Sequence, residues 1–332
     1  MVKQLAKTLS APPLLAALER AFASDGVSPL DSEVPVALWR RALAGPAAEF
    51  LARPGKELRA SIVRAGWALG GGDGPLPDAL PLALELLHAG SLIIDDVEDG
   101  SDERRGGPAL HTLVGTPLAI NTGSWMYFWA IAELSELGLD PLAELAVLRT
   151  TTRTLVRCHQ GQALDLATRI TEVDIADAPA VVAAITRLKT GALCGLAAEL
   201  GAIVAGAPPS AQHAIRTFGE TAGIALQMLD DLGSLASPSR RDKGDEDLLG
   251  RRATWPWAWA AEQGPFTWSR LTAIDDIDEL ARTLVATVEV TGRGRIRSTL
   301  ERALAELRAS VGERAAVDAI AGELRRMEAS YG

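Results

Sequence analysis

Cysteine and basic charge are both scarce in this sequence, and each scarcity excludes a class of protein. The 332 residues include only two cysteines, Cys158 and Cys194, too few for a disulfide framework or a cysteine-based zinc site. Lys and Arg number 33 against 43 Asp and Glu, which gives a formal net charge of −10. Because nucleic-acid binding needs basic surface to neutralise phosphates, we expect reduced thiols and no nucleic-acid partner.

Long hydrophobic runs are scarce as well. Met1 to Ser10 lacks the continuous apolar stretch of a signal peptide. The apolar segment Leu80–Ile94 contains Glu85 and His88, and it is shorter than the roughly 20 residues that a bilayer-spanning helix needs. We therefore expect no membrane span and a cytoplasmic protein.

The sequence is rich in helical periodicity. Hydrophobic residues make up 48% of it, and they recur at helical spacing, as at Leu300, Leu304 and Leu307. Strand-like alternation is weak. Glycine, proline and polar residues predict turns or loops at residues 70–81, 100–108, 207–210, 234–250 and 292–294. No clean linker divides the chain, so we predict an all-α single domain over residues 1–332, a bundle of about ten or more helices.

An acidic cluster directly follows the apolar helix predicted for residues 80–94. Asp95 and Asp99 are four residues apart, so their carboxylates leave the same face of a helix. At a helix C-terminus the macrodipole disfavours each acid by a few tenths to ~1 kcal/mol, a cost that a bound cation would offset. Carboxylates suit Mg²⁺, which usually also takes phosphate and water ligands. The guanidinium groups of Arg104 and Arg105 match phosphate oxygens, although a solvated helix end with local ion pairs gives the same pattern.

A second acidic cluster, residues 275–279, precedes an apolar-periodic stretch that begins at Leu280. Capping and the helix dipole alone explain acids at a helix N-terminus. We therefore expect this second cluster to be structural.

Five short motifs follow one another along the chain. They are Gly55-Lys56-Glu57-Leu58-Arg59, Asp95-Asp96-Val97-Glu98-Asp99 with Arg104-Arg105-Gly106, Lys189-Thr190, Gly223 to Asp231, and Lys243 with Asp247-Leu248 and Thr254. In this order they resemble the motifs of the trans-polyprenyl diphosphate synthases, the isoprenyl diphosphate synthase family that includes farnesyl and geranylgeranyl diphosphate synthases. The resemblance spans roughly residues 50 to 260. It implies an isoprenoid synthase type of all-α fold, in which two aspartate-rich motifs face each other over a central apolar cavity.

The resemblance also implies a transferase of isoprenoid biosynthesis. Members of this family ionise an allylic diphosphate with magnesium, for which we expect three ions with the bound diphosphate, and attach isopentenyl diphosphate to the resulting cation. Metal and cationic side chains would stabilise the charge that grows on the departing diphosphate. A dry cavity would keep water away from the carbocation.

Carried over position by position, the resemblance assigns four groups of residues. The expected magnesium ligands are Asp95, Asp99 and Asp230, with Ser234 as a further candidate, and Asp96 and Asp231 belong to the same catalytic motifs. The expected ligands of the allylic diphosphate and reacting carbons are Arg104, Lys189, Thr190, Gln227 and Lys243. The expected isopentenyl diphosphate site is Lys56, Arg59, His88 and Arg105. Product length would be set by Leu87, Gly90 and Ser91, whose sizes predict a product of about twenty carbons, within one five-carbon unit either way.

The sequence departs from the family pattern in three places. Ser234 stands where the second motif usually has a third aspartate, Arg252 where a lysine is usual, and Ser124 where aspartate is frequent. Asp230 and Ser234 have the spacing of a metal motif of class I terpene cyclases, so a cyclase acting on a single prenyl diphosphate is an alternative, as is a non-catalytic partner subunit. Pro238 stands where the cyclase motif expects glutamate, and the residues for isopentenyl diphosphate are retained, so elongation is favoured.

Two further segments carry hypotheses. The polar residues 234–250 are a candidate lid, mobile without ligand and ordered over a bound diphosphate. Trp125, Tyr127, Phe128 and Trp129 are bulky side chains that either close the cavity from another side or form the core of a dimer interface. We expect a homodimer.

Overall fold

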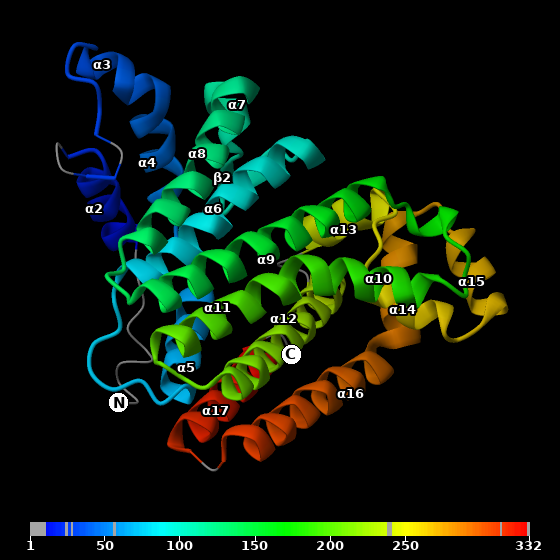
Figure 1. The fold of residues 1–332 in the computed structure, drawn as a ribbon. Coiled ribbons are helices and arrows are strands. Elements are labelled where there is room, and N and C mark those ends of the chain that lie inside the picture. Colours follow the sequence, from blue (N-terminus) through cyan, green and yellow to red (C-terminus); the bar gives the residue numbers. More distant parts are fainter. Residues whose placement is uncertain are drawn as a thin grey trace. The chain divides into compact units, whose positions relative to one another are not determined.

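The computed structural model describes residues 11–23, 26–27, 29–55, 58–237, 241–312 and 314–330, and Figure 1 shows its ribbon. Within these residues every regular element is a helix apart from one hairpin of two-residue strands, so the predicted all-α class is confirmed. The chain divides into two compact units. Unit 1 comprises Met1–Thr150 with Leu200–Gly206, and unit 2 comprises Thr151–Glu199 with Ala207–Gly332. The single domain over the whole chain stays a prediction.

The elements of unit 1 follow the chain in a simple order. They are α2 (Ala11–Ala21), α3 (Val36–Trp39), η1 (Arg40–Ala44), α4 (Gly45–Leu51), α5 (Leu58–Leu69), α6 (Ala79–Asp99), α7 (Leu110–Val114) and α8 (Thr116–Ser135). Strands β1 (Glu103–Arg104) and β2 (Gly107–Pro108) pair antiparallel between α6 and α7. Arg105 and Gly106 both have positive φ angles, 53° and 75°, as a two-residue hairpin turn requires. The loop expected at residues 100–108 is therefore partly a hairpin.

Unit 2 is built from the remaining helices. They are η2 (Ile170–Glu172), α10 (Ala178–Thr186), η3 (Arg187–Gly191), α12 (Pro209–Ala236), α13 (Arg241–Leu249), α14 (Trp255–Ala261), α15 (Pro265–Thr272), α16 (Ile277–Val311) and α17 (Ala315–Ser330). Two of the three sequence boundaries between the units fall within α9 (Pro141–Ala167) and α11 (Ala192–Val204), and the third lies between Gly206 and Ala207. Unit 2 therefore holds the second aspartate-rich motif, on α12, and unit 1 holds the first, on α6.

Two glycines let α6 and α8 pack backbone against backbone in unit 1. A Cβ atom built on Gly90 would lie 2.6 Å from the carbonyl oxygen of Gly123, and one built on Gly123 would lie 3.0 Å from that of Gly90. Both distances are shorter than an ordinary carbon contact, so neither position has room for a side chain. The small residue at Gly90, which the family pattern assigns to product length, is thus required by helix packing.

The turn expected at residues 292–294 is wrong, because Gly292 and Gly294 lie inside the long helix α16. A Cβ atom on Gly292 would come within 2.4 Å of the ring of Trp259, a fully buried residue of α14. Gly292 is therefore small because an indole packs against it. Such a contact is tertiary and leaves no mark in the local sequence.

The acidic residues before α16 have the structural role predicted for them. Asp276 is the N-cap, and its Oδ1 accepts the backbone N–H of Glu279 at 2.7 Å. This bond satisfies one of the free N–H groups of the first turn. The structural interpretation of residues 275–279 is confirmed.

The polar segment 234–250 is mostly helical, which corrects the expectation of a loop. Residues 234–236 end α12, and α13 begins at Arg241, while residues 238–240 lie outside the described residues. A Cβ atom on Gly244 would lie 2.6 Å from the carbonyl oxygen of Ser234, so α13 packs closely on the end of α12. The mobility proposed for this segment as a lid stays a prediction.

One stretch of the described residues, Ala178–Val204, is long and apolar enough to cross a bilayer by length and composition alone. It runs through α10, η3 and α11, and it is longer than the apolar segment at residues 80–94. In the structure 56% of its apolar window is buried inside the protein, as in the core helix of a globular protein. The absence of a membrane span stays a prediction.

The two glycines of α16 give opposite predictions for the same substitution. Gly292→Ala should lower the free energy of unfolding by about 1–3 kcal/mol, because the added methyl group overlaps the Trp259 ring. Gly294→Ala should raise it by about 0.5–1 kcal/mol, because a Cβ atom there meets no neighbour and alanine is the better helix former. Chemical denaturation of both variants measures the difference. Equal effects would contradict the packing of Trp259 on Gly292.

Candidate active site

The first acidic motif forms the last turn of α6, as its spacing predicts. Asp95 is half-buried, Asp99 is exposed, and Asp96 is fully buried. Gly100 ends the helix in the left-handed conformation, with φ 66°, and its N–H donates to the carbonyl oxygen of Asp96. Asp95 and Asp99 therefore present two solvent-accessible carboxylates one turn apart, whereas the carboxylate of Asp96 is buried inside the protein.

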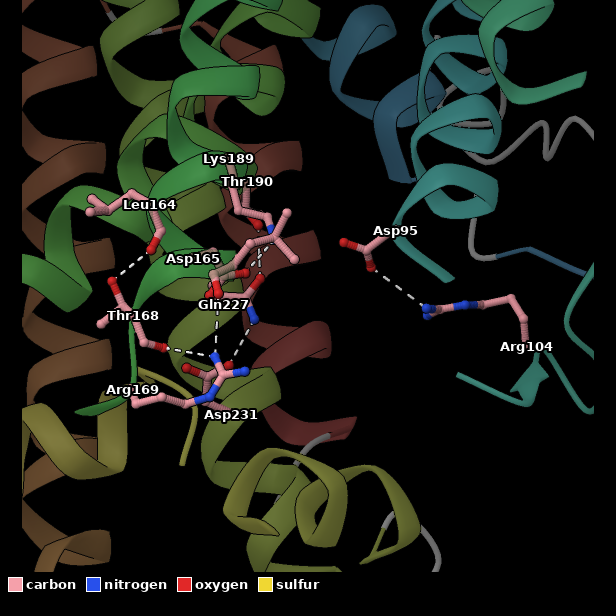
Figure 2. Close-up of polar contacts among 11 residues, drawn as sticks. Asp95, Arg104, Leu164, Asp165, Thr168, Arg169, Lys189, Thr190, Gln227 and Asp231 are labelled. Carbon is pink, nitrogen blue, oxygen red and sulfur yellow. Dashed lines mark hydrogen bonds and ion pairs between the residues drawn. The ribbon is translucent and has the colours of Figure 1, made fainter. Parts of the chain in front are cut away.

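Asp96 anchors Arg104 of the hairpin. Arg104 Nε donates to Asp96 Oδ1 at 2.6 Å, and Arg104 Nη2 pairs with the same oxygen. Arg104 Nη2 also lies 3.6 Å from Asp95 Oδ2, the contact drawn in Figure 2. Burial raises the pKa of Asp96 although the hydrogen bond from Arg104 lowers it. Burial alone would lower the pKa of Arg104, but the hydrogen bond and charge of Asp96 raise it above its usual value. Arg104 is thus a fixed cation beside the accessible carboxylates.

Three of the residues predicted for isopentenyl diphosphate lie within electrostatic range of one another. Burial, followed by the charges of Arg59, Arg105 and Arg104, lowers the pKa of His88 well below 6.5. His88 is therefore neutral near pH 7 and surrounded by guanidinium groups, as an anion-binding cluster would be. The fourth predicted residue, Lys56, lies outside the described residues.

Glu85 is a site residue that the sequence interpretation missed. Its side chain is buried, and Oε1 accepts the N–H of Ala60, in the first turn of α5, at 3.0 Å. Burial lowers the pKa of Arg105, and the charge of Glu85 opposes that shift. Glu85 therefore ties the start of α5, which carries Arg59, to α6, which carries His88. An acid inside an apolar helix was the available signal.

Phe50 and Arg53 were also missed, and they hold the hairpin in place. The guanidinium group of Arg105 lies over the ring of Phe50, 5.4 Å from its centroid, and that of Arg53 lies 5.7 Å from the same centroid. Arg53 Nη1 donates to the carbonyl oxygen of Arg104 at 2.8 Å, and Nη2 donates to that of Pro108 at 2.7 Å. Both strands are therefore fastened at the end of α4.

In unit 2 the structure brings together four of the predicted residues. Lys189 and Thr190 lie in η3, a π-helical turn of the kind often found at functional sites. Lys189 Nζ pairs with Asp165 Oδ2 of α9 at 2.5 Å. Thr190 Oγ1 donates to Gln227 Oε1 at 2.8 Å, and Gln227 Nε2 donates to Asp231 Oδ1 at 2.7 Å. Figure 2 shows this cluster.

The second acidic motif divides its roles as the first one does. Asp231 is buried, and its other oxygen, Oδ2, accepts the N–H of Trp255 at 2.9 Å. Ser234 is also buried, and its Oγ donates to the carbonyl oxygen of Asp231 at 2.9 Å. Asp230 is half-buried. This geometry favours Asp230 over Asp231 and Ser234 as the ligand that this motif offers to a metal.

The residues predicted to set product length have different surroundings. Leu87 is fully buried in α6. Ser91 is half-buried, and its Oγ donates to the carbonyl oxygen of His88 at 2.8 Å. Gly90 has no side chain and Ser91 has only a hydroxymethyl group, so Leu87 is the residue of the three with the most side-chain volume to lose.

The aromatic residues of α8 separate into two kinds. Trp125 stacks on Phe22, which directly follows α2, at 5.3 Å between ring centroids, and on Trp129 at 4.9 Å. Phe128 is 71% exposed. Trp125 and Trp129 therefore pack within unit 1, and only Phe128 is available at its surface among these three.

A divalent cation fits the donor chemistry of α6. Asp95 and Asp99 supply two carboxylates, and Mg²⁺ is commonly held by one or two carboxylates together with substrate phosphates and water. The described residues bring together no group of three or more His, Cys, Asp or Glu suited to a metal. The side chain of Lys243, the remaining predicted ligand of the allylic diphosphate, lies outside the described residues.

Comparison with known proteins gives one consistent family. A family model described as polyprenyl synthetase matches residues 40–280. Geranylgeranyl pyrophosphate synthase 2 of Zymoseptoria tritici is 31% identical over 256 residues, which are 75% of this chain and 71% of that protein. Geranylfarnesyl diphosphate synthase of Aeropyrum pernix is 34% identical over 203 residues, 59% of this chain and 63% of that protein. The chain thus spans less than two thirds of some curated relatives.

Solved structures share the fold over nearly the whole chain. Heptaprenyl diphosphate synthase from Staphylococcus aureus has a TM-score of 0.79 at 19% identity, over 99% of this chain and 98% of that chain. Polyprenyl synthase from Caulobacter crescentus, complexed with calcium and isoprenyl diphosphate, has a TM-score of 0.71 at 24% identity, again over 99% and 98%.

His88 should make the stability of the protein depend on pH. Its pKa is lowered in the folded state, so below about pH 6.5 the unfolded chain takes up a proton that the folded chain refuses. The resulting loss of unfolding free energy is absent above that pH and grows as pH falls, by at most about 1.4 kcal/mol per pH unit. His88→Gln should remove this component.

Urea unfolding at about pH 7, 6 and 5 measures that slope. His213→Gln, at an exposed position, is the matched control and should keep the wild-type slope. The same slope in His88→Gln as in wild type would show that folding does not lower the pKa of His88.

Proposed function

We propose that this chain, which belongs to the polyprenyl synthetase family, is a magnesium-dependent trans-prenyltransferase. It condenses an allylic diphosphate with isopentenyl diphosphate to give an all-trans prenyl diphosphate of about C20, within C15–C25. One observation carries the proposal: α6 presents the accessible carboxylates of Asp95 and Asp99, and His88 lies two turns earlier on the same helix within a guanidinium cluster. That helix thus offers both a metal-binding turn and a separate anion site.

The residues of α6 divide the work at the allylic diphosphate. Asp95 and Asp99 would hold magnesium in unit 1, and Asp230 of α12 is the candidate magnesium ligand of unit 2. The resemblance implies three ions in all. Bound magnesium supplies charge neutralisation of the departing diphosphate. Asp96 is fully buried and paired with Arg104, so its part is to aim that guanidinium group.

Two cations of this chain are held ready for diphosphate oxygens. Arg104 is fixed by Asp96, and Lys189 by Asp165 at 2.5 Å. A side chain that is already ordered loses less conformational entropy when it binds a substrate. The substrate phosphate would compete with Asp165 for Lys189.

The released diphosphate would accept the proton that the product loses in the last step. The reaction therefore needs no basic side chain of the protein.

The guanidinium cluster of unit 1 suits a second diphosphate. Arg59 and Arg105 supply permanent charge, and the neutral imidazole of His88 offers one N–H donor without adding to their repulsion. A terpene cyclase acting on a single diphosphate has no use for this second site. Its retention favours elongation over the cyclase, and the retained acids argue against a non-catalytic partner subunit.

The proposal includes a homodimer and a cytoplasmic location. Exposed apolar side chains support an interface on α8 and the start of α9. They are Ile120 at 44% exposure, Phe128 at 71%, Leu142 at 79% and Leu145 at 42%. Burial of such a group on association would be favourable at about 25 cal/mol per Å² of apolar surface.

Elongation is tested by incubating the protein with Mg²⁺ and a ten-carbon allylic diphosphate, with and without isopentenyl diphosphate. We expect a longer all-trans diphosphate only when isopentenyl diphosphate is present. Asp95→Asn should lower the rate about 10²–10³-fold, as when one stabilising group of a transition state is removed. Glu98→Gln, an exposed acid of the same turn, should stay close to wild type.

The same assay distinguishes the alternatives. A cyclic hydrocarbon formed without isopentenyl diphosphate would replace the proposal by the cyclase. Turnover that begins only when another subunit is added would replace it by the partner subunit.

Product length should respond to Leu87. Leu87→Ala should lengthen the product by one five-carbon unit, because it removes three carbons from a fully buried side chain of α6. Leu86→Ala, at an equally buried neighbouring position, is the matched control. Both variants should lower the free energy of unfolding by about 2–5 kcal/mol, but Leu86→Ala should leave the product length unchanged. Product chromatography measures the length. An unchanged product of Leu87→Ala would show that Leu87 does not limit product length.

A further inference from the structure

Four hydrogen bonds connect Thr190 of η3 to Thr186, the last residue of α10, through residues of α12 and α14. Thr190 donates to Gln227 at 2.8 Å, and Gln227 donates to Asp231 Oδ1 at 2.7 Å (Figure 2). The backbone N–H of Trp255 donates to Asp231 Oδ2 at 2.9 Å, and its indole Nε1 donates to Thr186 Oγ1 at 3.0 Å. Because Thr186 directly precedes η3 and Thr190 lies in it, the chain of bonds closes into a ring around this turn.

The ring is buried where it matters. Asp231, Trp255 and Thr186 are exposed by only 7%, 9% and 5%. A polar group that loses its partner in such surroundings costs about 1–3 kcal/mol, so each of these groups is held to one orientation. Asp231 accepts one of these bonds on each carboxylate oxygen, so both of its oxygens take part in the ring.

Helix α14 contains an internal comparison for Trp255. Its other tryptophans, Trp257 and Trp259, are also buried, and in the described part of the chain their Nε1 atoms have no hydrogen-bond partner. Bulk is therefore what those two residues contribute. Trp255 contributes a directed N–H group as well.

The ring lies next to two residues of unit 2 with proposed roles in binding the allylic diphosphate and its metal, Lys189 and Asp230. A π-helical turn is rare and needs surrounding contacts to persist, and Lys189 stands in it between Thr186 and Thr190. Asp230 is joined to Asp231 by the backbone. We propose that Trp255 and Thr186 are positioning residues that hold Lys189 and Asp230 in place for the allylic diphosphate. This inference rests on the proposed function of the site.

Two variants remove the indole bond with little change in shape. Trp255→Phe keeps an aromatic ring and the backbone N–H to Asp231, and Thr186→Val keeps the branched Cβ. Each should weaken binding of geranyl thiodiphosphate, a slowly ionising allylic analogue, about 3–10-fold in the presence of Mg²⁺. Calorimetry of the full chain measures this binding without turnover.

A kinetic split distinguishes positioning from a general loss of structure. The KM for the allylic diphosphate should rise by the same factor, whereas the KM for isopentenyl diphosphate should not change, because Arg59, His88 and Arg105 belong to unit 1. Trp257→Phe removes, from the same helix, an indole whose N–H has no hydrogen-bond partner in the described part of the chain. This variant should bind the analogue within about twofold of wild type, a change well below one hydrogen bond.

The variants also test each other. The double variant Trp255→Phe with Thr186→Val should match the worse single variant, because both remove the same bond. Thr186→Ser restores a hydroxyl acceptor and should recover wild-type binding. If Trp255→Phe does not fold, Thr186→Val and Thr186→Ser carry the comparison.

The outcomes separate this inference from the proposed function. Equal binding by Trp255→Phe and Trp257→Phe, or no binding by wild type, overturns the positioning role. Wild type that binds the analogue but elongates nothing overturns the proposed function, and weaker binding by Trp255→Phe alone still supports the positioning role.

Discussion

The pair of buried Asp96 and half-buried Arg104 is the interaction on which the organisation of unit 1 depends. Four acids end α6, where the helix dipole already disfavours negative charge. Arg104 of the hairpin lies beside them and offsets that charge. A two-residue turn with positive φ at Arg105 then directs the next guanidinium group over Phe50 and toward His88. One ion pair therefore orients both arginines, one for each of the two proposed diphosphates.

Each acidic motif pairs an anchor with a ligand. Asp96 and Asp231, the second acids of their pairs, are buried and committed to hydrogen bonds, whereas Asp95 and Asp230 are half-buried. Consecutive helical residues point about 100° apart, so a doubled acid naturally places one carboxylate inward and one outward. The inward one fixes Arg104 in unit 1 and the first turn of α14 in unit 2. A doubled aspartate thus supplies both a metal ligand and the means to hold its surroundings.

The features that the sequence predicted correctly are local ones. The helical spacing of Asp95 and Asp99 and the cap at Asp276 depend on residues within one turn. The turn expected at Gly292 was wrong because glycine is needed there to make room for the ring of Trp259, 33 positions away. Glu85 was missed because its partner is a backbone N–H on another helix. Family resemblance supplied the roles of distant residues, but not the reasons for their orientation.

Ser234 illustrates why a motif must be interpreted through its packing. Its spacing from Asp230 matches a cyclase metal motif, yet the hydroxyl donates to the backbone of its own helix and the residue is 2% exposed. Gly244 of α13 packs against the carbonyl oxygen of Ser234 itself, which a Cβ atom on Gly244 would approach to 2.6 Å. A carboxylate at position 234 would therefore be desolvated beneath α13, at a cost of several kcal/mol unless paired. Serine suits that close packing, and the proposed magnesium ligands are Asp95, Asp99 and Asp230.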